Sequence, residues 1–98
     1  MIIYNYSNLC RMSDLNMVEL TERQIQILKA IIEEYIETAE PVGSQTLDKK
    51  YNLGISPATI RNEMVHLTEN QFLKQPHTSA GRIPTAAGMK FYVKQLMK

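Results

Sequence analysis

The sequence contains one cysteine, no long apolar run and almost no net charge over its 98 residues. Cys10 alone cannot form an intrachain disulfide, and without cysteine or histidine nearby it does not indicate a metal site. Because no apolar segment is long enough to span a bilayer and the first residues lack a basic and apolar leader, we expect a cytoplasmic protein with no membrane partner. A phosphate-binding glycine loop, a metal cluster and a nucleophile–base pair are also missing, so the sequence predicts neither an enzyme nor a cofactor.

The formal net charge of +1 conceals an uneven distribution along the chain. The chain up to Pro41 contains seven acidic and three basic side chains, whereas the chain from Val42 onward contains eight basic and three acidic ones. A polyanion is therefore attracted to the C-terminal part and repelled by the N-terminal part. Two ordinary solvated surfaces would give the same pattern, so charge alone leaves both interpretations open.

The length predicts one small domain. Residues 1–20 show no sustained periodicity, and Met12 and Met17 offer alternative starts. We therefore expect residues 1–20 to be an N-terminal extension, disordered or partly non-native, and residues 21–98 to form the domain.

Two helices are expected in the first half of that domain. Thr21-Glu22-Arg23-Gln24 has the form of a capping box, with Leu20 and Ile25 placed as a hydrophobic staple. The predicted inner stripe of this helix is broad and comprises Ile25, Ile27, Leu28, Ile31, Ile32, Tyr35 and Ile36. Glu33, Glu34, Glu37 and Glu40 are expected to face solvent, because catalytic carboxylates would need partners that the sequence lacks. After the break at residues 41–43, Ser44 is predicted to cap a short helix that ends near Tyr51.

A third helix is expected after a tight turn at Gly54, with Ser56 as its cap and Pro57 in its first turn. The spacing predicts that Ile60, Met64 and Leu67 face inward. The side chains predicted to face outward are Ala58, Asn62, Val65 and Glu69, with Thr59, Arg61 and His66 on the flanks.

Two short strands, at residues 72–75 and 82–83, are expected to form a projecting hairpin. Thr85 is then placed to cap a fourth helix, whose apolar positions are Met89, Tyr92, Val93, Leu96 and Met97. Phe91 lies off this face, which indicates a contact with another subunit or a further domain, or an ordinary exposed aromatic. The element order predicts a mainly α fold with a small β-hairpin, a winged helix-turn-helix.

In a helix-turn-helix the second helix enters the DNA major groove and presents its N-terminal residues to the base edges. The predicted contacts from this helix are Ser56, Ala58, Thr59, Arg61, Asn62, Val65 and His66. An amide such as Asn62 can pair with adenine, Arg61 can reach guanine or a phosphate, and small apolar side chains can cover thymine methyl groups. A helix with a few solvated polar residues is the alternative.

The predicted wing contacts are His77, Thr78, Ser79, Gly81 and Arg82, and Ser44 is a candidate phosphate contact at the start of the second helix. Arg82 is expected to enter a minor groove, whose negative potential favours a guanidinium group. A surface cation on a turn is the alternative for Arg82, and a local loop anchor for His77. Lys90, Lys94 and Lys98 follow one another at four-residue intervals, which suits either a solvated face or a phosphate track.

Residues 20–97 resemble the N-terminal DNA-binding domain of the HrcA family of heat-inducible bacterial transcription repressors. The resemblance is carried by the strings Leu20-Thr21-Glu22-Arg23-Gln24, Glu34-Tyr35-Ile36, Glu40-Pro41-Val42-Gly43-Ser44, Ser56-Pro57-Ala58-Thr59-Ile60-Arg61-Asn62-Glu63-Met64 and Gln75-Pro76-His77-Thr78-Ser79-Ala80-Gly81-Arg82-Ile83-Pro84-Thr85. It implies a stress-response repressor that binds an inverted-repeat operator in double-stranded DNA as a homodimer, with a chaperonin as partner, in the bacterial cytoplasm and at the nucleoid.

The sequence departs from the family pattern at two places in the domain. Asn70-Gln71 stands where the family usually has glycine, and we expect Asn70 to tolerate the left-handed conformation there. Met89 stands where an aromatic residue is usual. Two alternatives remain beside the repressor: a winged helix that binds another protein, and a stand-alone DNA-binding regulator without the heat-shock role.

Overall fold

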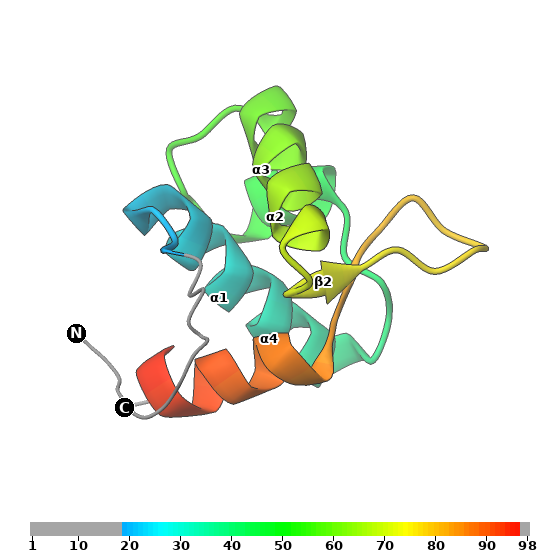
Figure 1. The fold of residues 1–98 in the computed structure, drawn as a ribbon. Helices are drawn as coiled ribbons and strands as arrows, with labels where there is room; N and C mark the ends of the chain where they lie inside the picture. Colours follow the sequence, from blue (N-terminus) through cyan, green and yellow to red (C-terminus); the bar gives the residue numbers. More distant parts are fainter. Residues whose placement is uncertain (1–18, 97–98) are drawn as a thin grey trace.

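The computed structural model describes the backbone of residues 19–96 and the side chains up to Gln95. Predictions on residues 1–18, on the side chain of Leu96 and on Met97 and Lys98 lie outside the described residues. Along the chain follow α1 (Glu22–Thr38), α2 (Ser44–Lys50), α3 (Pro57–Glu69), β2 (Leu73–Lys74), β3 (Ile83–Pro84), α4 (Ala86–Phe91) and the π-helical turn η1 (Tyr92–Leu96). The fold is mainly helical with one antiparallel hairpin, which confirms the predicted class (Figure 1).

Side-chain caps mark the N-termini of three of the four α-helices. Thr21 Oγ1 accepts a hydrogen bond from the Gln24 backbone amide, and Gln24 Oε1 accepts one from the Thr21 amide, both at 3.1 Å. Ser56 and Thr85 cap α3 and α4 as predicted. Ser44 was wrongly predicted as a cap, because the N-cap of α2 is Gly43 and no side chain bonds there. The preceding residue, Val42, is held extended by pairing with Arg82, so the helix begins one residue earlier than expected.

The buried stripe of α1 is rotated relative to the prediction. Ile27 and Ile31 are fully buried and Glu34, on the same line of the helix, is only 4% exposed, although it was expected in solvent. Ile36 is 58% exposed, although it was expected inside. Residues two positions apart in an α-helix differ by about 200° around its axis, so a helix that turns Glu34 inward must turn Ile36 outward.

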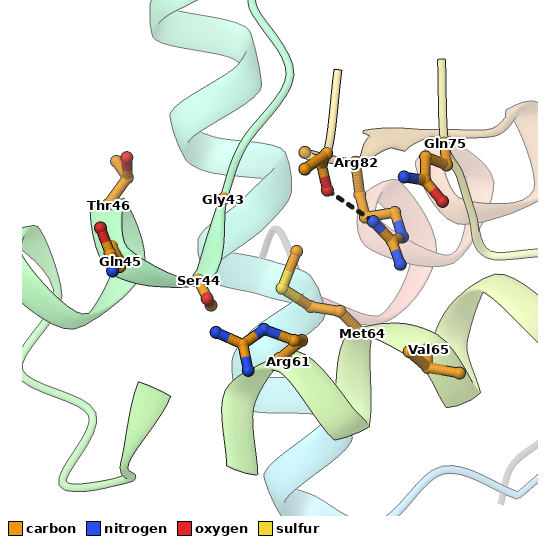
Figure 2. A pocket seen from close by; sticks show the side chains of 11 residues that line it. Gly43, Ser44, Gln45, Thr46, Arg61, Met64, Val65, Gln75 and Arg82 are labelled. Carbon is orange, nitrogen blue, oxygen red and sulfur yellow. Dashed lines mark hydrogen bonds between the residues drawn. The ribbon is translucent and has the colours of Figure 1, made fainter. Parts of the chain in front are cut away.

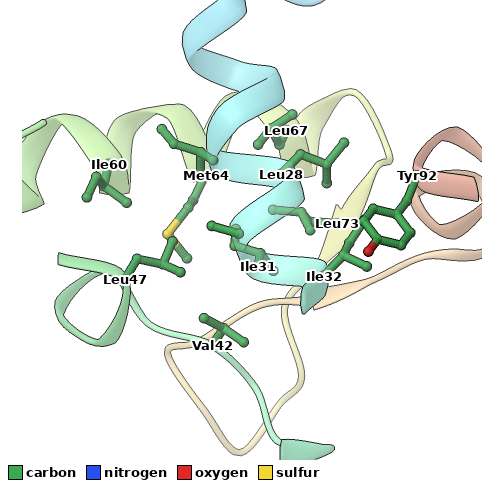
Figure 3. Packing of buried hydrophobic residues seen from close by; sticks show 12 residues of the cluster. Leu28, Ile31, Ile32, Val42, Leu47, Ile60, Met64, Leu67, Leu73 and Tyr92 are labelled. Atoms are coloured by element: carbon green, nitrogen blue, oxygen red, sulfur yellow. The ribbon is translucent and has the colours of Figure 1, made fainter. Parts of the chain in front are cut away.

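The core lies where α1 crosses α3, with α2 and the hairpin closing its sides (Figure 1). Ile60, Met64 and Leu67 point into it from α3 with no more than 3% exposure, which confirms the predicted inner face of that helix. Figure 3 shows these side chains around Leu28 and Ile31 of α1. Burial of this apolar set is the main force that holds α3 against α1 and leaves its other side free.

The hairpin is shorter than predicted and is joined by a third segment. Leu73 pairs with Pro84 and Lys74 with Ile83, so the second strand begins after Arg82. Arg82 instead exchanges two backbone hydrogen bonds of 2.9 Å with Val42, from the connection between α1 and α2. The intervening residues 75–82, here called the wing loop, project from the body of the domain (Figure 1).

The turn between α3 and β2 places the left-handed conformation one residue later than expected. Gln71 has φ 69°, whereas Asn70 has φ −87° and ψ 6°. The Asn70 amide still bonds to His66 O, and the Gln71 amide bonds to Thr68 O. The helix therefore extends its hydrogen bonding to Gln71, and the reversal falls on that residue. At the turn before α3, Gly54 has φ 71°, a left-handed conformation that suits glycine.

At the C-terminal side, the π-helical turn changes which side chains face the core. Tyr92 is buried as predicted, but Val93 is 56% exposed. Phe91, expected off the apolar face, packs edge-on against Phe72 with ring centroids 5.6 Å apart. A π turn contains more residues than an α turn, so the regular spacing used in the prediction does not continue through residues 92–96.

Candidate nucleic-acid interface

The outer face of α3, formed by Ala58, Asn62, Val65 and Glu69, is exposed along its whole length. Val65 is 38% exposed, whereas Met64 beside it is 3% exposed and faces the core. The packing of Ile60 and Leu67 against α1 determines this orientation. The polar amide of Asn62 and two small apolar side chains are thus presented together on one side of a firmly held helix.

The two hydroxyl groups at the start of α3 are engaged with each other. Ser56 Oγ accepts from the Thr59 backbone amide at 3.2 Å and donates to Thr59 Oγ1 at 3.0 Å. Ser56 is exposed and Thr59 is half-buried. Their first structural role is therefore to begin the helix, and the unused acceptor capacity of Thr59 Oγ1 remains for an outside donor.

The two flank residues Arg61 and His66 have different neighbours. His66 Nδ1 lies 3.5 Å from Glu63 Oε1, and Glu63 also accepts from Gln24 Nε2 at 3.0 Å and lies 3.6 Å from Arg23 Nη1. These contacts link α3 to the first turn of α1. Arg61 forms no ion pair within the part of the chain that the structure describes, so its charge is uncompensated at this surface.

The wing loop places its predicted residues in two groups. His77 and Thr78 are exposed at the tip. Ser79 is half-buried, and its Oγ accepts from the Gly81 amide at 2.9 Å. Gly81 is buried, and a Cβ there would lie 3.0 Å from atoms of Pro41 and Val42. The glycine is needed for this close approach of two chain segments.

Arg82 lies at the base of the wing loop and is held by its own side chain as well as by Val42. Its Nε donates to Thr68 Oγ1 at 3.0 Å, and its Nη1 donates to Ala80 O at 2.7 Å. Thr68 Oγ1 in turn donates to Met64 O within α3. Arg82 therefore connects the wing loop to α3. A guanidinium group has five N–H donors, so three remain for an outside acceptor.

A cleft of about 510 Å³ separates the start of α2, α3 and the wing loop (Figure 2). We call it the basic cleft because two arginines line it and, within residues 19–96, no acidic residue does. Its lining residues are Gly43, Ser44, Gln45, Thr46, Arg61, Met64, Val65, Gln75, Ala80, Gly81 and Arg82. Ser44, predicted as a phosphate contact, lies in it together with Arg61 and Arg82.

Sequence reasoning missed Gln45, Thr46 and Gln75 as members of this surface. Their polar side chains line the cleft, yet α2 is too short to show a clear helical period, and Gln75 was assigned to a strand. The one available signal was the position of Gln75 at the start of the string that ends at Thr85.

The orientation of α2 is stabilised by a buried carboxylate on α1. Glu34 Oε2 accepts from Lys50 Nζ at 2.9 Å, and Glu34 Oε1 accepts from the Tyr51 hydroxyl at 3.1 Å. The Lys50 hydrogen bond lowers the pKa of Glu34, and Glu34 raises the pKa of Lys50. Burial, together with Glu34, raises the pKa of Tyr51 to about 12. These contacts hold the end of α2 and so the wall of the basic cleft that α2 provides.

The described residues form neither a metal site nor a membrane-spanning helix. Within residues 19–96 no three histidine, cysteine or carboxylate side chains are grouped as metal ligands would be. None of the helices described there combines the length and apolar character that a membrane span requires.

Known proteins are similar to this chain in sequence, and a solved structure is similar to it in fold. The family described as winged helix-turn-helix transcription repressor, HrcA DNA-binding, matches residues 19–96. The heat-inducible transcription repressor HrcA of Carboxydothermus hydrogenoformans is 62% identical over 79 residues, and that of Clostridium perfringens is 58% identical over 79 residues. Each of these alignments covers 81% of this chain, which spans 23% of the length of either relative.

A crystal structure at 2.2 Å resolution, described only as that of a hypothetical protein, superposes with a TM-score of 0.74 at 48% sequence identity. The superposition covers 76% of this chain and 24% of that one. The family match therefore includes every element from α1 to η1, together with the exposed helix α3 and the wing loop. This chain belongs to the HrcA family of heat-inducible transcription repressors and carries the family's winged helix-turn-helix DNA-binding domain.

Proposed function

We propose that this chain binds double-stranded DNA sequence-specifically, with α3 in the major groove, and that it represses transcription at an operator. The observation that carries the proposal is the outer face of α3. Asn62 is exposed there between Ala58 and Val65, while the opposite side of the helix is packed against α1. An amide and small apolar groups are the chemistry that reads adenine and the methyl group of thymine in the major groove.

The positions predicted to contact DNA remain part of this proposal. Arg61, with no ion pair among the described residues, is available to a guanine or a phosphate. His66 on α3 and the loop tip at His77 and Thr78 are exposed and so accessible to a ligand. Ser56 and Thr59 support the start of the helix, and Gly81 allows the wing loop to pass close to Pro41.

The test is selection of bound duplexes from a random pool, followed by affinity measurement on the selected sequence and on a scrambled one. Asn62→Ala should weaken binding to the selected duplex by about 1–3 kcal/mol and relax the preference at one base position, because one paired contact to a base is lost. Equal affinity of the unaltered protein for selected and scrambled duplexes would contradict the proposal.

Gln26→Ala is the matched control for Asn62→Ala. Gln26 is an exposed amide on α1, so its removal changes a surface of the same polarity outside the proposed interface. We expect it to leave both affinity and base preference unchanged. Thermal unfolding of both variants shows whether either loss comes from the fold.

The finer features concern assembly and setting. We infer a homodimer on an inverted-repeat operator, because one module of this size contacts a single half-site and binds weakly alone. The mass of the complex with a selected duplex tests this, and one chain per duplex with no repeat in the selected sequence would contradict it. Family membership is the basis for three further proposals: a chaperonin partner, action in the cytoplasm at the nucleoid, and control by heat. Copurification of a chaperonin with the protein tests the first of these.

A further inference from the structure

The basic cleft lies between the two elements that would occupy neighbouring grooves of DNA. Figure 2 shows Arg61 and Arg82 on different sides of Met64, with Arg61 on α3 and Arg82 at the end of the wing loop. Ser44 and Gln75 add polar groups, and none of the carboxylates that the structure describes lines the space. A site with two cations, neutral donors and no acid is suited to a phosphate group.

The bonding of Arg82 restricts what it can reach. Its backbone is paired with Val42, and its side chain donates to Thr68 Oγ1 and Ala80 O. It is therefore fixed at the base of the wing loop and not at the exposed tip. The tip residues at 76–80 include no lysine or arginine. These bonds hold the guanidinium group of Arg82 beside α3.

The path of DNA follows from the proposed function, on which this inference rests. If α3 lies in the major groove and the tip of the wing loop meets the adjacent minor groove, one sugar–phosphate strand separates the two grooves and must pass between these elements. The space between them is the basic cleft. We propose that the basic cleft holds this DNA backbone strand, and that Arg82 is a phosphate contact that positions the duplex without reading its sequence.

Arg82→Gln tests the proposal through affinity measured over a range of salt concentrations on the selected and the scrambled duplex. Each phosphate neutralised by the protein contributes about 0.9 to the slope of log affinity against log salt. We expect Arg82→Gln to weaken binding to both duplexes by the same factor, about tenfold or more at low salt, and to reduce the slope by about 0.9. A loss confined to the selected duplex would overturn the proposal.

Lys29→Gln is the control for net charge. Lys29 is an exposed cation on α1, away from the lining of the cleft. We expect the slope of log affinity against log salt for Lys29→Gln to equal that of the unaltered protein. The same decrease as in Arg82→Gln would show a general effect of charge and would overturn the assignment.

A series of duplexes with one phosphate replaced by an uncharged methylphosphonate locates the contact. At one position per half-site, the replacement should lower the affinity of the unaltered protein for the duplex but should not lower the affinity of Arg82→Gln any further. If no position shows this coupling, and the effect of Arg82→Gln changes when A·T pairs facing the wing loop are exchanged for G·C, then Arg82 reads the minor groove and the proposal fails.

Thr68→Val separates contact from support of the fold. It removes the acceptor of the Arg82 Nε bond but keeps the charge. We expect its salt slope to remain unchanged, whereas a loss equal to that of Arg82→Gln would assign Arg82 to holding the wing loop alone and would overturn the proposal. If the unaltered protein binds no duplex at low salt, the proposed function itself fails; if it binds and Arg82→Gln binds equally well, only this inference fails.

Discussion

Replacement of Gly88 by alanine should destabilise the domain, although it places a better helix former in a helix. Gly88 is buried in the first turn of α4, directly under the backbone of Phe72. A Cβ added there would overlap the carbonyl oxygen of Phe72, well inside the normal carbon–oxygen contact of about 3.3 Å. The obstacle is backbone, so it cannot move aside by a change of rotamer.

The magnitude follows from two opposing effects. Alanine in place of glycine within a helix gains up to about 1 kcal/mol. Against this, forced displacement of packed backbone costs about 1–3 kcal/mol, and the Thr85 amide bond to Phe72 O, 3.1 Å long, is disturbed at a cost of about 1 kcal/mol. The expected net loss is about 1–3 kcal/mol, which lowers the melting temperature by about 4–8 °C for each kcal/mol.

Thermal unfolding followed by circular dichroism, with urea unfolding beside it, measures this loss. Ala87→Gly is the control, because Ala87 is exposed one residue earlier in α4 and reports helix propensity alone, up to about 1 kcal/mol. Both substitutions should destabilise, although propensity predicts opposite signs for them. A melting temperature of Gly88→Ala above that of the unaltered protein would refute the close contact of α4 with Phe72.

Two further predictions concern the connections around α3. Glu34 should stabilise the fold above its ordinary pKa of 4.5, and this stability should be lost as the pH falls through the lowered pKa that Glu34 has in the folded protein. The stability contributed by Tyr51 should be lost as the pH rises from 10 to about 12. Urea unfolding measured against pH should show both losses, and Glu34→Gln should remove the loss at acidic pH. Gln71→Gly should stabilise the domain by about 0.5–1 kcal/mol, because glycine adopts the left-handed conformation at φ 69° without the steric strain of a Cβ. An unchanged or lower melting temperature would contradict this.

Features encoded by near neighbours in the sequence were predictable. The capping box at Thr21, the caps Ser56 and Thr85, and the inward positions of α3 each depend on residues three or four apart, and all are found in the structure. The exposure of Asn62 follows from the same periodicity. The fold class followed from the order of such local signals.

Features that depend on distant partners were not predictable. Glu34 is buried because Lys50 and Tyr51 satisfy its two oxygens from another helix, and no local pattern on α1 indicates them. The base of the wing loop differs from the prediction because Arg82 pairs with Val42, forty residues earlier in the sequence. The basic cleft depends on that pairing, so its membership required the structure.

The pairing of Val42 with Arg82 has a mechanical consequence for the domain. Two backbone hydrogen bonds join the end of the wing loop to the residues just before α2, so the hairpin is connected directly to the helix-turn-helix. On a duplex, successive grooves recur at a fixed offset, and a protein that spans two of them needs a matching spacing. Residues 41–43 contact the wing loop and lead into α2, so we expect a substitution that disturbs this pairing to shift both elements relative to the duplex.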